Sequence, residues 1–125
     1  MLISTVVPIL SKKLLTFLFG GATTIVQNCF EPNPCNYLDD MWTYDGTQWT
    51  QMTYNGIRPP KRAFGTMVYD TARQEMVLFG GRGEQAHQHS DTWEYDGNSW
   101  QQITPTDPEG DGNPSARSTH AMVYD

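Results

Sequence analysis

Two histidines and an aspartate form the clearest group of side chains in this sequence that could do chemistry. His87, His89 and Asp91 occupy alternate positions, and imidazole and carboxylate groups at this spacing can chelate a transition metal. A His-x-His pair in an exposed loop is far more often solvated than metallated, and the sequence places no further ligand close by. We therefore expect no metal and no cofactor, and we treat the two histidines as candidates for binding a partner.

An acidic segment is the second candidate for ion binding. Asp107, Glu109 and Asp111 alternate ahead of Gly112, as oxygen ligands do at the start of a calcium-binding loop. Ser118 stands where the bidentate acid that closes such a loop is expected. We interpret the segment as a solvated acidic loop.

The only two cysteines of the chain, Cys29 and Cys35, lie close together with Pro32 and Pro34 between them. A disulfide here would cross-link a loop, and it would favour an oxidising compartment, outside the cell or at its surface. A structural metal site would need two more ligands, which the neighbouring sequence does not supply. Two free thiols in a reducing cytosol are the alternative.

The elements that must position these groups are repeated. DMWTYDGTQW at residues 40–49 returns as DTWEYDGNSW at residues 91–100, so that Trp42 and Trp93 are 51 residues apart. The double glycine after an apolar run also returns, and so does the motif Met-Val-Tyr-Asp after an arginine: Gly20-Gly21 and Gly80-Gly81, Arg62 with residues 67–70, and Arg117 with residues 122–125. A period of this length indicates a stacked or radial repeat architecture.

Composition favours β structure and excludes some partners. Aromatic residues make up 12% of the chain, and no segment carries apolar residues at helical spacing over three turns, so we expect no helix. The net charge is −6, and the lysines and arginines form no basic stripe. Nucleic acid and anionic membrane surfaces are therefore not expected as partners.

The best preserved repeat is expected to contain four antiparallel strands. They are predicted at residues 63–69, 75–79, 91–95 and 100–103, each short and bounded by turn-forming residues. In an up-and-down meander, the tight turns lie at one end of the strands and the loops between strands two and three and after strand four lie at the other end. The latter loops are long and differ between copies, which is typical of recognition surfaces.

The repeated motifs together resemble kelch repeats, and more narrowly those of bacterial secreted or surface proteins. The resemblance covers the chain from Phe17 onward. It implies an all-β fold: a fragment of a kelch-type β-propeller with antiparallel four-stranded blades, about two to two and a half of them, not closed into a ring. Most such domains bind proteins or glycans.

The resemblance divides residues 1–125, expected to be one partial propeller domain, into three parts. Residues 1–61 would form a first, degenerate blade with a linker, residues 62–103 a second blade, and residues 104–125 a loop and the first strand of a third blade. In the first blade, Pro8 falls inside strand one, where it removes a ladder donor and predicts a degraded or edge strand. An alternative takes residues 14–26 as the apolar part of a signal peptide, which would be too short to span a membrane.

The resemblance also implies roles for individual residues. The glycines end strand two, and the aromatic residues pack the blades together; this structural set comprises Gly20, Gly21, Gly80, Gly81, Trp42, Trp49, Trp93, Trp100, Tyr44 and Tyr95. The arginines before strand one either order backbone carbonyls, the role we favour, or line a polar site. The candidate binding residues of the long-loop face are Arg62, Arg82, Gln85, His87, His89, Asn36, Tyr37 and Arg117.

The function that we expect is therefore an interaction module for a protein or carbohydrate ligand. The alternative is part of an extracellular enzyme, similar to the kelch domain of galactose oxidase or to another sugar-converting kelch enzyme, with catalytic residues in other blades. No nucleophile motif or phosphate loop is present, so we name no catalytic residue. Open strand edges also make self-association an expected behaviour.

Overall fold

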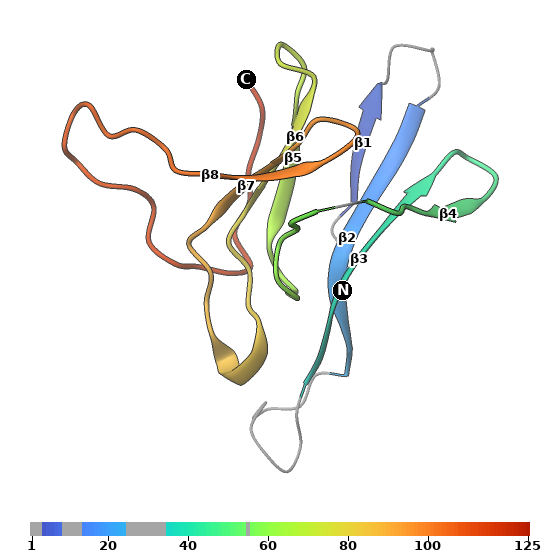
Figure 1. Ribbon diagram of the computed structural model, residues 1–125, viewed down its shortest axis with the longest axis horizontal. Coiled ribbons are helices and arrows are strands. Elements are labelled where there is room, and N and C mark those ends of the chain that lie inside the picture. Colours follow the sequence, from blue (N-terminus) through green and yellow to red (C-terminus); the bar gives the residue numbers. More distant parts are fainter. Residues whose placement is uncertain (1–3, 9–13, 25–34, 55) are drawn as a thin grey trace.

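The computed structural model describes residues 4–8, 14–24, 35–54 and 56–125. In this part of the chain, eight strands form two antiparallel sheets of four, with the orders β1-β2-β3-β4 and β5-β6-β7-β8 (Figure 1). The all-β prediction is confirmed, because the one helical segment described is a 3-10 turn, η1 (Glu84–Ala86). The strands are β1 (Ser4–Pro8), β2 (Leu14–Thr24), β3 (Asn36–Tyr44), β4 (Trp49–Gln51), β5 (Thr66–Asp70), β6 (Glu75–Phe79), β7 (Thr92–Tyr95) and β8 (Trp100–Ile103).

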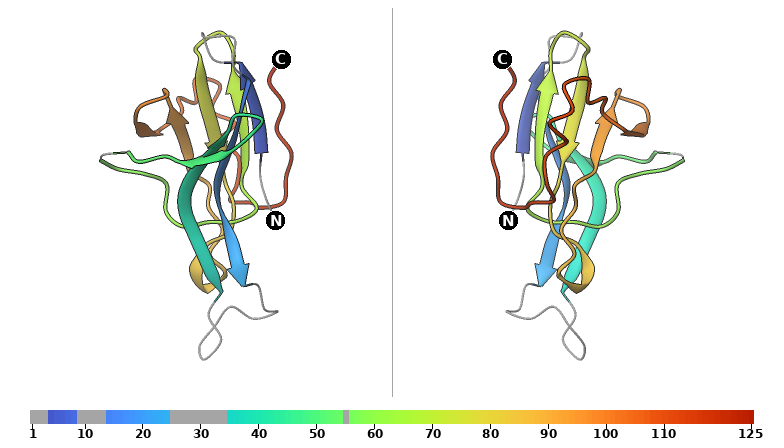
Figure 2. Two further views of the ribbon diagram at one scale, coloured as in Figure 1. Left: turned by 90° about the vertical axis from the view of Figure 1, so that its right-hand side faces the viewer. Right: turned by 90° about the vertical axis from the view of Figure 1, so that its left-hand side faces the viewer.

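Each sheet is one four-stranded blade, and the two blades do not close into a ring. Every strand pairs with its neighbour in sequence, so that each blade is a simple meander. We call the sheet β1–β4 blade 1 and the sheet β5–β8 blade 2. The strands β1 and β5 lie next to each other, as the first strands of adjacent blades do in a radial arrangement (Figure 2).

The tight turns between the third and fourth strands form as their sequence predicts. In blade 2, the Asp96 carboxylate accepts hydrogen bonds from the backbone N–H groups of Asn98 and Ser99, both at 2.8 Å. In blade 1, Asp45 accepts the equivalent bonds from Thr47 at 2.9 Å and Gln48 at 3.0 Å. These bonds hold the pKa of Asp96 below its usual value, because they stabilise the ionised carboxylate.

The first strand of blade 2 is shorter than expected. It begins at Thr66 instead of residue 63, because Phe64 has a positive φ of 60° and interrupts the ladder opposite Gly80 and Gly81. On the other side of Phe64, Ala63 pairs with Arg82 through two backbone hydrogen bonds of 2.9 and 2.7 Å. The predicted bounds of β6 and β8 agree with the structure.

Blade 1 extends into a segment where a loop was expected. Its strand β2 continues past Gly20-Gly21 to Thr24, and two register shifts let its end pair with the start of β3. The alternative took residues 14–26 as the apolar part of a signal peptide. The described part of this run, residues 14–24, is a β-strand. The strand β1 ends at Pro8 and lies at the edge of its sheet, as a proline in strand one predicts.

The main core lies between the two blades. Alternate residues of β2 and β3 point from blade 1 toward blade 2, and alternate residues of the second blade point back. Trp100 lies at the centre, with its ring 5.2 Å from that of Phe19 and 5.2 Å from that of Tyr95. The buried cluster consists of Phe17, Phe19, Met41, Met67, Met76, Leu78, Trp93, Tyr95 and Trp100.

The C-terminal segment differs from the prediction. Residues 104–125, expected to include the first strand of a third blade, contain no strand. Residues 121–125 have no neighbouring strand of their own blade to pair with in the described part of the chain, and a strand needs such a partner. Instead the segment runs along blade 2, where the His120 carbonyl accepts a 2.7 Å hydrogen bond from the Thr66 hydroxyl.

Within the described residues, no helix is long and apolar enough to cross a membrane.

Candidate functional site

The long-loop face is the end of the molecule that carries residues 80–91, opposite the tight turn at residues 71–74 (Figure 1). Its β6–β7 loop is stiffened by backbone contacts. Gly83 donates to the His87 carbonyl at 2.8 Å, and His89 donates to the Gly81 carbonyl at 2.9 Å. Gln85 has a positive φ of 53° inside the 3-10 turn, which presents its side chain to solvent at the tip of the loop.

A hollow of about 340 Å³ lies beside this loop and combines both signs of charge. His87 and His89 form one wall, with their rings in an edge-to-face arrangement at 4.9 Å. Pro60, Lys61 and Glu84 form the rest. The two histidines were predicted, whereas Lys61 and Glu84 were missed because nothing in their local sequence distinguishes them from ordinary surface charges.

His89 lines the hollow, and its surroundings lower its pKa. Burial lowers its pKa, the positive charge of Arg62 lowers it further, and Asp91 opposes these effects only in part. Its Nε2 is buried and has no hydrogen-bond partner among the described residues. A Cβ on Gly83 would lie 2.7 Å from this nitrogen, so a side chain at this position would displace the imidazole. The lowered pKa favours the neutral form of the imidazole, whose Nε2 is closed off from solvent.

Arg62 has a structural position instead of a ligand-facing one. Its side chain is only 1% exposed, and its guanidinium contacts both oxygens of Asp91 at 2.6 and 2.7 Å and the Gly80 carbonyl at 3.0 Å. Burial tends to raise the pKa of Asp91, but hydrogen bonds from Arg62 and Trp93 outweigh it and hold that pKa below its usual value. This geometry supports the structural role that we favoured for Arg62, and its binding role stays a prediction.

The other predicted binding residues do not converge on one site. Tyr37 is 2% exposed and packs with Cys35 and Ala63, so it is not available to a ligand. Asn36 is exposed at the start of β3, where it donates to the Thr23 hydroxyl at 2.7 Å. Arg82 is half-buried, and Arg117 is exposed and bonds to Ser115. Of the predicted set, only His87 and His89 line the hollow.

Cys35 is buried and disulfide-bonded. Cys29, its predicted partner, lies outside the described residues, so the pairing stays a prediction. Within the described ranges, no group of three His, Cys, Asp or Glu side chains is arranged to hold a metal ion.

The repeated aromatic residues differ between the two blades. Trp93, Tyr95 and Trp100 are buried in the core. The counterparts Trp42 and Tyr44 are half-buried, and Trp49 is 46% exposed and stacks on Tyr44 at 5.1 Å. Trp49 therefore does not pack between the blades as we expected, because its side of blade 1 faces away from blade 2.

At each double glycine the chain turns sharply, and the backbone of a later segment passes close to the first glycine. Gly20 and Gly80 have positive φ angles of 63° and 67°. A Cβ at Gly20 would lie 2.5 Å from the Arg62 carbonyl oxygen, and one at Gly80 would lie 2.5 Å from the Arg117 carbonyl oxygen. Glycine is needed at both corners for the segment that follows each blade to dock.

Comparison with known families agrees with this architecture. A family model described as the KLHDC2/KLHL20/DRC7 Kelch-repeats domain matches residues 5–125. No curated protein matches the chain.

Proposed function

This chain belongs to the kelch-repeat family, and from this premise we propose that it binds a protein partner through its long-loop face. Kelch repeats are commonly protein-interaction modules. The observation that carries the proposal is the hollow of mixed charge formed by Pro60, Lys61, Glu84, His87 and His89. It lies on loops held by a rigid β scaffold, which is the usual arrangement of a recognition surface.

The chemistry of the hollow favours a polar peptide segment as the ligand. Lys61 offers a positive charge and Glu84 a negative one, and both side chains are exposed. The His89 ring contributes to the wall between these two charges, and its lowered pKa favours the form without a charge of its own. Such a surface complements a segment that itself carries both signs of charge, because charge complementarity gives specificity at interfaces.

Two finer assignments belong to the same proposal. The resemblance of the motifs to bacterial secreted or surface proteins supports a location outside the cell, and a Cys29–Cys35 disulfide would agree with an oxidising compartment. A role as part of a galactose-oxidase-like enzyme gains no supporting observation from the described residues. A glycan ligand remains the competing outcome that the experiment must separate from a peptide.

The test is a peptide-display selection and a glycan array, both probed with the intact chain and two variants. The first variant combines Lys61→Ala, Glu84→Ala and His87→Ala in the hollow. The matched control combines Gln48→Ala, Thr71→Ala and Asn98→Ala, three exposed residues of the tight turns at the opposite end. Selected peptides should lose at least about tenfold in affinity with the first variant, which corresponds to about 1.4 kcal/mol, and should keep it with the control.

Equal binding by both variants would show that the long-loop face is not the recognition surface. Hits confined to the glycan array, and lost with the first variant, would keep the face and replace the peptide by a carbohydrate. Thermal unfolding of each variant confirms that the fold is retained, since the substituted side chains of both sets lie at the surface.

A further inference from the structure

Arg62 joins the two blades of the chain by two sets of bonds. Its backbone belongs to the corner of blade 1: its N–H donates to the Leu38 carbonyl at 3.0 Å, and its carbonyl accepts from Gly21 at 2.8 Å. Its guanidinium belongs to blade 2, where it pairs with Asp91. We call this arrangement the arginine link.

Arg117 reproduces the first half of the link. Its N–H donates to the His89 carbonyl at 3.1 Å, and its carbonyl accepts from Gly81 at 2.8 Å, as at the corner of blade 1. Its Nε donates to the Ser115 carbonyl at 3.0 Å, just as the Nε of Arg62 donates to Pro60 at 3.0 Å. Its side chain is exposed and pairs with no carboxylate in the described part of the chain.

Asp40 reproduces the other half. It is the counterpart of Asp91, and each aspartate accepts a 2.6 Å hydrogen bond from the indole N–H of the tryptophan two residues later, Trp42 or Trp93. In Asp91, both carboxylate oxygens also contact Arg62. In Asp40, Oδ1 is buried and has no hydrogen-bond partner among the described residues. A buried carboxylate oxygen in this state is costly unless a cation or donor reaches it.

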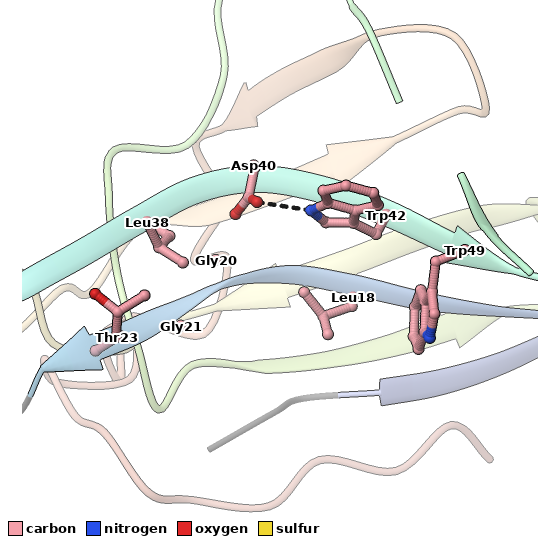
Figure 3. A pocket seen from close by; sticks show the side chains of 9 residues that line it. Leu18, Gly20, Gly21, Thr23, Leu38, Asp40, Trp42 and Trp49 are labelled. Carbon is pink, nitrogen blue, oxygen red and sulfur yellow. Dashed lines mark hydrogen bonds between the residues drawn. The ribbon is translucent and has the colours of Figure 1, made fainter. Parts of the chain in front are cut away.

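The surface around Asp40 is an apolar hollow of about 470 Å³ on the outer face of blade 1. Leu18, Trp42 and Trp49 line the hollow together with Asp40, whose carboxylate points toward the Trp42 indole (Figure 3). The residues at the same positions of blade 2, Leu78, Trp93 and Trp100, are 1%, 5% and 2% exposed because blade 1 covers them. The hollow thus has the shape and chemistry of a blade-to-blade contact whose second side none of the described residues provides.

The matching surface lies at the other end of the chain. Phe79 is the counterpart in blade 2 of Phe19, the residue of blade 1 that contacts Trp100 between the blades. Phe79 lines a hollow bordered by Asp91, Thr92 and residues 113–116. Arg117 follows directly after this rim. On this outer face of blade 2, Phe79 is 9% exposed and its ring packs against that of His120 at 5.5 Å. The exposed Arg117 beside it supplies the positive charge that the outer face of blade 1 lacks.

We propose that a second copy of this chain docks head to tail on blade 1, so that its Arg117 pairs with Asp40 as Arg62 pairs with Asp91. The contact is heterologous, because different faces of the two copies meet. Repetition of such a contact generates a closed ring if the rotation per copy closes and an open filament if it does not. The free aromatic face of blade 1, centred on Trp49, becomes covered in the assembly.

The test uses charge reversal and mixing of the full chain. Light scattering after size-exclusion chromatography should give the native chain a molar mass above that of the monomer, and this molar mass should increase with protein concentration. Arg117→Asp alone and Asp40→Arg alone should each be monomeric, because like charges then meet at the contact. An equimolar mixture of the two variants should assemble again, since the reversed pair and the native pair alternate along the assembly.

The matched control is a double variant that carries both changes in one chain, Asp40→Arg with Arg117→Asp. It should assemble like the native chain, because the reversed pair then forms between copies. Recovery in the mixture also shows that the single variants are folded, because an unfolded chain could not restore the contact.

Three results would overturn the proposal. The first is a native chain that stays monomeric at about 1 mM, where even a contact with a dissociation constant of about 100 μM would be largely occupied. The second is assembly of the single variants at the native level. The third is a folded mixture that remains monomeric. The first would indicate that a different protein or another blade covers Asp40.

Discussion

The side chain of Arg62 is 1% exposed, and the Asp91 carboxylate faces its guanidinium at 2.6 Å. Removal of one partner from a buried ion pair leaves the other charge without compensation, which costs far more than the pair itself contributes. We expect Arg62→Ala to lower the free energy of unfolding by about 3–5 kcal/mol. Urea denaturation of a dilute chain measures this change without interference from self-association.

Arg117 provides the matched control for this prediction. It has the same backbone environment in the repeat, but its side chain is exposed. Arg117→Ala should therefore change the free energy of unfolding by less than about 0.5 kcal/mol. Equal losses for the two variants would contradict the buried ion pair as the source of the stability.

The pH dependence of stability gives a second measurement of the same pair. The pKa of Asp91 in the folded chain lies below its unfolded value, so its contribution is present above the unfolded pKa and is lost as the pH falls through the folded pKa. Asp91→Asn should therefore reduce the acid-induced loss of stability. Asp70 and Asp96 also have lowered pKa values, so part of the acid-induced loss should remain.

Sequence reasoning recognised Arg62 but missed its partner. Arg62 and Asp91 are 29 residues apart, and no local rule joins them. A signal was nevertheless present, because an arginine before strand one and an Asp-x-Trp at strand three both recur in the sequence. Two elements that recur together in one repeat are candidates for contact, and that inference would have named Asp91 as the partner of Arg62.

At the scale of the elements, the fourth strands of the two blades place equivalent tryptophans in opposite environments. Trp100 of β8 is 2% exposed and contacts Phe19, whereas Trp49 of β4 is 46% exposed. We expect Trp100→Ala to lower the free energy of unfolding by about 3–5 kcal/mol, because it opens a large cavity in the core between the blades. Trp49→Ala should cost less than about 1 kcal/mol in the dilute monomer.

Denaturant unfolding of the two variants side by side tests this difference. Comparable losses for both would mean that the outer face of blade 1 is already covered in the monomer. A small loss for Trp100→Ala would instead contradict the packing of blade 2 on blade 1.

Most strands could be predicted because their signals are local. The bounds of β6 and β8 follow from short apolar or aromatic runs between turn residues. The errors concern features that depend on distant partners. Tyr37 lies in a segment of loop-like composition, yet pairing with the end of β2 makes it part of a strand and buries it. Residues 121–125 have strand-like composition, but no strand among the described residues pairs with them.

At the scale of the whole molecule, neither blade has a complete core of its own. The main cluster joins Phe17, Phe19 and Met41 of blade 1 with Trp93 and Trp100 of blade 2, among others. A single sheet with one face exposed would leave these side chains in water, and the loss of apolar burial would be large for both blades. The period of the sequence repeat predicted the blades, but it could not show that their stability is shared.

We therefore expect the two blades to unfold in one transition. Met41→Ala, a substitution in blade 1 at a residue that is fully buried, should lower the free energy of unfolding by about 2–5 kcal/mol. The midpoint should shift equally for the blue-shifted fluorescence of the buried tryptophans of blade 2 and for the far-ultraviolet circular dichroism of the whole chain. Ile57→Ala, at a residue that is 63% exposed, should shift neither midpoint. If the fluorescence midpoint stayed in place while the dichroism midpoint moved, blade 2 would be stable without blade 1, and the shared core would contribute less than its burial indicates.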